Sequence, residues 1–117
     1  MRSIFIKRVY EPASVQDGFR VLVDRLWPRG MSKEQASAVW MKELAPSTQL
    51  RKWFNHDPSK WQEFKARYFA ELDQQSGAVA LLLYEAAKGP LTLLYSSRNI
   101  EYNQAVVLRE YLLQHPA

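Results

Sequence analysis

Residues 19–30 read FRVLVDRLWPRG, and this stretch decides the predicted fold class. From Phe19 to Leu26 the run is apolar on both faces until Asp24, which is typical of a strand covered on both sides in a parallel sheet. Proline and glycine then occupy the second and fourth positions of WPRG, where a type I turn prefers them. The stretch therefore predicts a central strand that ends in a turn.

Helix signals follow this turn. Ser32 and Gln35 have the S-x-x-Q spacing of a capping box, so a short helix should start at Ser32. Residues 38–44 fit either the end of that helix or a short strand, since so brief a run has no decisive periodicity. A helix is predicted over 47–54, where Leu50, Trp53 and Phe54 have helical spacing, and another after the Asp57-Pro58 cap, with Trp61, Phe64, Tyr68 and Leu72 on one face. A buried helix is predicted over 77–88 and should end at Gly89-Pro90. A last helix is predicted over 100–114, capped by Asn99 and burying Tyr102, Val106 and Leu113.

Two more strands are predicted, over residues 3–9 and 90–97, with a loop at 10–18 between the first strand and the central one. Strands that alternate with helices indicate an α/β fold with a small, at least partly parallel β-sheet flanked by helices. At 117 residues, the chain has the length of one ordinary domain with one hydrophobic core, so we expect a single domain over 1–117.

The amino-acid composition excludes several kinds of site and indicates the type of protein. The chain has no cysteine, which excludes disulfides, thiolate zinc sites and a cysteine nucleophile. The apolar run near the N-terminus is too short for a signal peptide, and no stretch approaches the ~20 apolar residues of a membrane span, so we expect a cytoplasmic protein without a membrane partner. The net charge of +4 permits a nucleic-acid partner without requiring one.

Candidate site residues follow the predicted strands. Ligands of open α/β sheets bind beyond the carboxyl ends of the strands. A helix start after the last strand would add free N–H groups that attract anions, although ordinary capping by Ser97 or Asn99 explains the same residues slightly better. The predicted ligand-binding residues are Arg8 and Tyr10 after the first strand, Arg25, Trp27 and Arg29 after the second, and Ser96, Ser97, Arg98 and Asn99 after the last.

Asp24 and Arg25 are ionic groups at the end of an apolar strand. Alternation directs their side chains to opposite faces, so each needs a separate partner if it is buried. A structural ion pair with another element explains them about as well as a ligand does.

The other functional signals are weak. The tryptophans are more typical of core positions than of base stacking, except Trp27 beside two arginines. His56 fits a helix C-terminus and His115 a frayed tail. The chain has no metal-ligand spacing, no nucleophile elbow and no sign of a cofactor. Asp24, Glu101 and Tyr95 form a thin set of candidate acids and bases, so no catalytic residue is assigned.

Several stretches together carry a family resemblance: IKRVYEP, DGFRVLVDRLWPRG, ELAPSTQLRKWFNHDPSKWQEFKARYFAEL, PLTLLYSSRN and YNQAVVL. In order and spacing they resemble the bacterial family known as domain of unknown function 488, in its short YeaO-like branch. The resemblance covers almost the whole chain and implies a small cytoplasmic α/β protein. Longer relatives carry a glycine-histidine-serine stretch after the first strand and a cysteine after the last, where this chain has RVY and YSSRN, so no catalytic residue carries over.

Three functions remain open from the sequence. The leading hypothesis is a pocket for a phosphate- or carboxylate-bearing ligand, with a nucleotide among the candidates, lined by the arginines and serines of the strand ends. The second is a nucleic-acid-binding module in which Trp27 stacks on a base. The third is a structural or protein-interaction domain whose arginines only brace the edge of the sheet. The sequence leaves the oligomeric state open.

Overall fold

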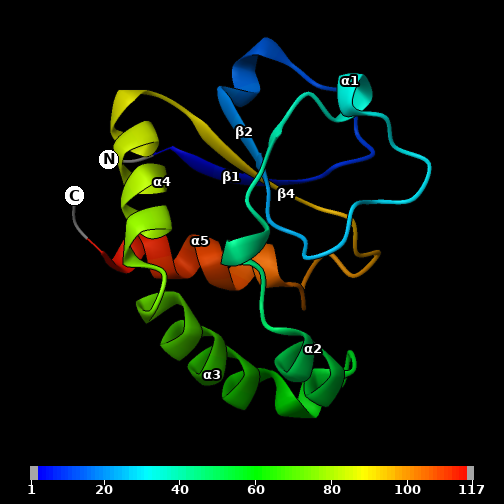
Figure 1. Ribbon diagram of the computed structural model, residues 1–117, viewed down its shortest axis with the longest axis vertical. Helices are drawn as coiled ribbons and strands as arrows, with labels where there is room; N and C mark the ends of the chain where they lie inside the picture. Colours follow the sequence, from blue (N-terminus) through cyan, green and yellow to red (C-terminus); the bar gives the residue numbers. More distant parts are fainter. Residues whose placement is uncertain (1–2, 116–117) are drawn as a thin grey trace.

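The computed structural model describes residues 3–115, and its centre is a four-stranded parallel sheet (Figure 1). The strand order is β1-β4-β2-β3, and every neighbouring pair is parallel. The strands are β1 (Ile4–Arg8), β2 (Phe19–Leu22), β3 (Val39–Trp40) and β4 (Leu91–Tyr95), and the helices are α1 (Lys33–Ala36), α2 (Thr48–Phe54), α3 (Trp61–Asp73), α4 (Ser76–Lys88) and α5 (Gln104–Gln114). The predicted α/β class is confirmed.

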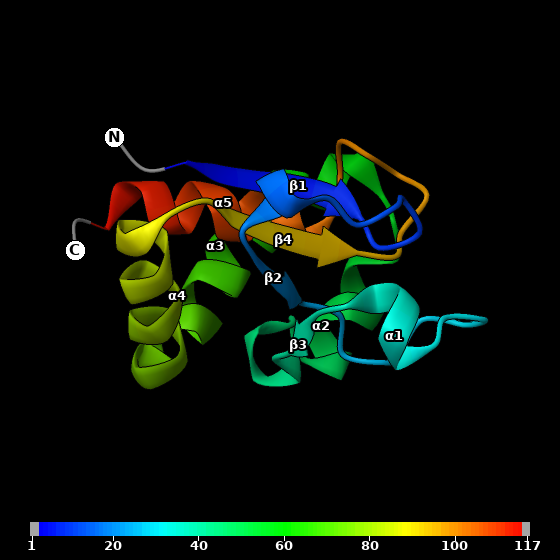
Figure 2. The same cartoon turned by 90° about the horizontal axis from the view of Figure 1, so that it is seen from above.

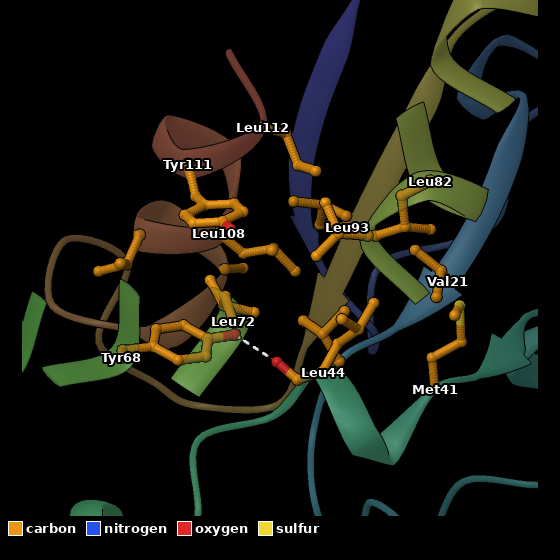
Figure 3. Close-up of a cluster of buried hydrophobic side chains, with 14 of the residues drawn as sticks. Val21, Met41, Leu44, Tyr68, Leu72, Leu82, Leu93, Leu108, Tyr111 and Leu112 are labelled. Atoms are coloured by element: carbon orange, nitrogen blue, oxygen red, sulfur yellow. Dashed lines mark hydrogen bonds between the residues drawn. The ribbon is translucent and has the colours of Figure 1, made fainter. Parts of the chain in front are cut away.

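The sheet divides the buried side chains into two clusters rather than the one core expected. The larger cluster joins one face of the sheet to α2, α3, α4 and α5, and α5 packs along β1 and β4 (Figure 2). Figure 3 shows its centre, where Val21 and Leu93 from the strands meet Leu72, Leu82 and Leu108 from the helices. The smaller cluster, built from Val9, Leu22, Ala36 and Leu94, fills the other face. Both faces of β2 and β4 are therefore covered, as the apolar run at residues 19–26 predicted.

Capping residues and apolar spacing place three helices correctly. Ser32 accepts a hydrogen bond from Gln35 N, and the Gln35 side chain accepts one from Ser32 N, which completes the predicted capping box. Asp57 caps the short 3-10 turn Pro58–Lys60 that leads into α3. α2 ends at Phe54, as predicted. The ambiguous residues 38–44 resolve into β3 and a 3-10 turn, because Ser37 adopts a left-handed backbone that ends α1.

The central strand is shorter than predicted. β2 ends at Leu22 instead of Leu26, because the Asp24 side chain, rather than a backbone carbonyl, accepts the hydrogen bond from Ser96 N. The turn that follows centres on Arg29 and Gly30, one residue later than predicted, where Gly30 has a φ of 71° that favours glycine.

Two helix predictions were wrong in detail. Asn99 does not cap the last helix, because its side chain accepts hydrogen bonds from Glu101 N and Tyr102 N in a separate turn, and Asn103 caps α5 instead. The buried face of α5 moves accordingly to Ala105, Val107, Leu108, Tyr111 and Leu112, while Leu113 is exposed.

The helix predicted over 77–88 is not buried all round. α4 buries only Val79, Leu82 and Ala86, and it exposes Leu81 and Tyr84. Its uniformly apolar sequence does not indicate which face meets the core.

Gly18 fixes the alignment of β2 with β4. Its φ is 65°, and a Cβ built on it would lie 2.1 Å from the carbonyl oxygen of Pro90. That same oxygen accepts a hydrogen bond of 3.0 Å from Phe19 N at the start of the strand pair. No side chain can therefore replace the glycine hydrogen without separating the strands.

We expect Gly18→Ala to lower the free energy of unfolding by about 3 kcal/mol or more, measured by urea denaturation. A left-handed backbone costs alanine about 1–2 kcal/mol, and overpacking adds about 1–3 kcal/mol. Gly30→Ala is the matched control, because its φ of 71° is similar and no atom lies within 4 Å of the added Cβ. Equal losses in the two variants would contradict the steric role of Pro90.

Candidate anion-binding pocket at the carboxyl edge of the sheet

The carboxyl ends of β1, β4 and β2 lie level at one edge of the sheet. Arg8 pairs with Tyr95 across β1 and β4, and Leu22 pairs with Leu94 across β2 and β4. A pocket of about 470 Å³ opens beyond this edge. Its lining residues are Asp24, Arg25, Leu26, Ala45, Pro46, Arg51, Lys52, Phe54, Asn55, His56, Phe64, Ser96, Ser97, Tyr102, Asn103 and Gln104.

Three of the predicted ligand-binding residues line this pocket: Arg25, Ser96 and Ser97. Arg8 is outside the lining, and its guanidinium group donates to Ser96 O at 3.0 Å and to Ser97 O at 2.9 Å. Arg8 therefore holds the loop after β4 in place. Its guanidinium group also lies 5.1 Å from the centre of the Tyr10 ring.

The remaining predicted residues lie outside the pocket lining. The Tyr10 hydroxyl donates to the backbone oxygen of Arg29, which links the loops after β1 and β2. Trp27 packs edge-on against Trp40 at 5.4 Å, and its indole N–H donates to Met31 O. Asn99 supports its own turn, and Arg98 is exposed beside it.

Asp24 forms the buried polar floor of the pocket. Only 8% of its surface is exposed. One carboxylate oxygen accepts from Ser96 N at 3.1 Å, and the other accepts from the Gln104 side chain at 2.6 Å. Burial raises the pKa of Asp24, although the hydrogen bonds from Ser96 and Gln104 and the positive charge of Arg51 act in the opposite direction. Asp24 thus joins the end of β2 to the end of β4 and the start of α5.

Arg25 has a separate partner, as the alternation of side chains predicted. Its guanidinium group donates to Pro46 O at 2.9 Å and to Ala45 O at 3.2 Å, just before α2. Neither Arg25 nor Asp24 forms an ion pair with any residue of 3–115. Arginine has five N–H donors, so Arg25 supports the wall and keeps donors for a ligand.

Sequence reasoning missed the cations that α2 supplies. Arg51 and Lys52 lie in the last turn of α2, where they also suit the helix dipole, and both are exposed at the pocket. His56 follows them, and both it and Asn55 have left-handed backbones with φ of 56° and 46°. Two consecutive non-glycine residues in this region are a costly arrangement that is often found at functional sites. The sequence signal that could have indicated these cations was the basic pair Arg51-Lys52 near the end of the predicted helix.

The first turn of α5 adds a third source of positive potential. Asn103 caps this eleven-residue helix, and Asn103 and Gln104 both line the pocket. The pocket therefore combines three basic side chains and a helix N-terminus with one buried carboxyl group. This arrangement suits an anion that also offers a hydrogen-bond donor to the floor.

A second, shallower depression lies beside Phe19, Arg20 and Val39. Its single cation is neutralised, because Arg20 forms an ion pair with Asp17 at 2.5 Å and donates to Ala36 O. Within residues 3–115, no three acidic or histidine side chains converge on a metal-binding geometry. None of the described helices combines the length and the apolar character needed to cross a membrane. The pocket at the carboxyl edge is therefore the better candidate site.

The fold and the pocket define a small parallel α/β protein with a polar, predominantly basic site at the edge of its sheet. The family model that matches residues 3–117 is described as the inactive DUF488-N3 subclade, and the chain belongs to that family. The resemblance to domain of unknown function 488 is thus confirmed.

Two relatives illustrate the match. The uncharacterized protein YeaO of Escherichia coli is 48% identical over 111 residues, which is 94% of this chain and 96% of the relative. The uncharacterized protein Rv3073c of Mycobacterium tuberculosis is 40% identical over 108 residues, or 92% of this chain and 91% of the relative. No solved structure is significantly similar to the chain.

We expect Asp24→Asn to change how stability depends on pH. Because burial raises the pKa of Asp24 above its ordinary value of 3.8, the charged form is disfavoured in the folded protein. The contribution of Asp24 to the free energy of unfolding therefore falls as pH rises from 3.8 through the raised pKa. The variant cannot titrate there, so its stability relative to wild type should increase over that interval and then level off.

Urea unfolding at closely spaced pH values between about 4 and 8 measures this difference. The Gln104 amide can turn to accept from the new asparagine, so the variant keeps its hydrogen bonds. Glu101→Gln, which removes an exposed charge outside the pocket, is the control. A difference between Asp24→Asn and wild type that stays constant with pH would contradict the expectation.

Proposed function

We propose that the pocket at the carboxyl edge binds a small ligand that carries a phosphate or a carboxylate group. The observation that carries the proposal is the state of Arg51 and Lys52: both line the pocket, and neither side chain forms a hydrogen bond or ion pair with any residue of 3–115. Arg25, also in the lining, is a third cation with donors to spare. Among residues 3–115, the lining contains one carboxyl side chain, that of Asp24.

Binding explains this arrangement better than internal support does. The arginine that only braces the edge, Arg8, uses its guanidinium group on two backbone carbonyls of the loop after β4. Arg51 has no such target, yet its charge reaches Asp24 inside the pocket. Arginine offers two parallel N–H donors to phosphate or carboxylate, so an anion in the pocket would complete its bonding.

We propose binding without a reaction. The description of the family as inactive supports this. His56 is exposed at the pocket, but its ring contact is with Phe54, at 6.5 Å between ring centres, rather than with a group that it could activate. No catalytic role is therefore part of the proposal.

The nucleic-acid alternative has less support. Trp27, the ring proposed to stack on a base, already packs on Trp40. Trp53 lies between Lys60 and Arg67, whose charged groups are 5.1 Å and 4.3 Å from its ring centre. These rings have internal partners, so a base would have to displace them.

We expect thermal-shift measurements to show stabilisation of the wild type by phosphate, sulfate, carboxylates or organic phosphates, and a weaker shift for Arg51→Gln. A ligand at ~100 times its Kd adds about 2.7 kcal/mol of stability. Losing a charged hydrogen-bond donor costs about 1.5–3 kcal/mol of binding, so affinity should fall at least tenfold. Arg51→Gln should fold normally because its side chain has no bond to lose within residues 3–115.

Lys33→Gln is the charge-matched control, since Lys33 lies in α1 and outside the pocket lining. Arg98→Gln tests whether the site extends to the rest of the predicted edge, and an unchanged shift would confine it to the pocket. The screen should include mixed oligonucleotides, whose binding with a steep salt dependence would favour the nucleic-acid alternative. No shift from any compound would refute the proposal and leave the bracing role.

A further inference from the structure

Asp24 is a feature that the binding of a bare anion does not explain. A carboxyl group at the floor of a basic pocket repels phosphate or sulfate whenever it is ionised. It is nevertheless buried, with 8% of its surface exposed, and two other chain segments donate hydrogen bonds to it. A hydrogen-bond acceptor, the Asp24 carboxyl group, therefore lines the same pocket as the cations that would bind an anion.

The hydrogen bonds of Asp24 leave it with acceptor capacity. An ionised carboxylate has about four lone-pair sites, two on each oxygen. Ser96 N uses one site, the Ser96 side chain a second and the Gln104 amide a third. One site is left, and a hydroxyl group of a ligand is a donor that can fill it.

The size and walls of the pocket indicate an organic ligand. A volume of about 470 Å³ lies within the range of about 300–1,000 Å³ found for pockets that hold small organic ligands, and exceeds what one inorganic ion fills. Leu26, Pro46 and Tyr102 contribute apolar surface to the lining. The body of the ligand would pack on these side chains, with its anionic group directed toward Arg51 and Lys52.

We propose that Asp24 is the specificity-determining residue of the pocket and selects phosphate esters of hydroxylated sugars, such as nucleoside monophosphates, over bare anions. The inference rests on the proposed anion-binding function. In it, the basic residues hold the phosphate and the Asp24 carboxylate accepts a hydrogen bond from a sugar hydroxyl group. Asp24 then favours the sugar phosphate, whose hydroxyl group it binds, and disfavours the bare anion, whose charge it repels.

Titration calorimetry at constant ionic strength tests this with AMP, ribose 5-phosphate, 2′,3′-dideoxy-AMP and inorganic phosphate. In the wild type we expect AMP and ribose 5-phosphate to bind at least about tenfold more tightly than inorganic phosphate. The dideoxy compound keeps the phosphate and the base but lacks both ribose hydroxyl groups, so it should lose most of that preference.

Asp24→Asn should separate specificity from folding. The asparagine has one carbonyl oxygen, whose two acceptor sites Ser96 N and the Ser96 hydroxyl group can fill, so AMP should bind about tenfold more weakly. Inorganic phosphate should bind as well as before or better, because a repelling charge is gone. A purely structural role for Asp24 would weaken both ligands alike. Glu101→Gln, a nearby charge removal outside the pocket lining, should leave both affinities unchanged.

The outcomes separate this inference from the function on which it rests. Equal binding of AMP, its dideoxy analogue and phosphate would overturn the role of Asp24 but keep the anion site. Binding of none of the compounds would overturn both. If Asp24→Asn fails to fold, as shown by circular dichroism, the wild-type comparison of AMP with its dideoxy analogue decides alone.

Discussion

The parallel alignment of β4 between β1 and β2 is the constraint on which the rest of the structure depends. Gly18 has no side chain, so Phe19 N can reach Pro90 O and start β2 level with β4. Because parallel strands run in the same direction, a level start gives a level finish, and the loops after β1, β2 and β4 leave from one edge. The pocket exists because the loops after β2 and β4 meet α2 and α5 there.

Much of the fold could be predicted because its signals are local. A long apolar run indicates a strand covered on both faces, and the capping residues Ser32 and Asp57 act on amides two or three positions away. The strand ends then place Arg25 and Ser96 at the site without knowledge of strand order, because carboxyl ends of parallel strands share an edge.

The rest depends on tertiary contacts that one sequence does not display. Asn99 and Asn103 both accept from backbone amides two or three residues ahead, so sequence cannot tell which one starts the helix. The pocket residues Arg51 and Lys52 lie on a helix whose place over the sheet edge is set by Arg25 and the packing of α2 on α3. Their spacing along α2 indicates only a basic helix end.

The polar residues at the carboxyl edge of the sheet fall into two groups. Some hydrogen-bond the backbone and support the edge, and others have side chains available to bind a ligand. Arg8 is committed to backbone carbonyls of the loop after β4, and Arg25 is committed in part. Arg51 and Lys52 have no such partners within residues 3–115. Asp24 belongs to both groups: it joins β2, β4 and α5, and it keeps one acceptor site for a ligand. A protein that needed only a stable edge could replace a buried carboxyl group by an apolar side chain, since an ion without a paired charge costs stability in the interior. The position of Asp24 in a pocket with Arg51 and Lys52 is therefore better explained by selection between ligands than by the stability of the fold.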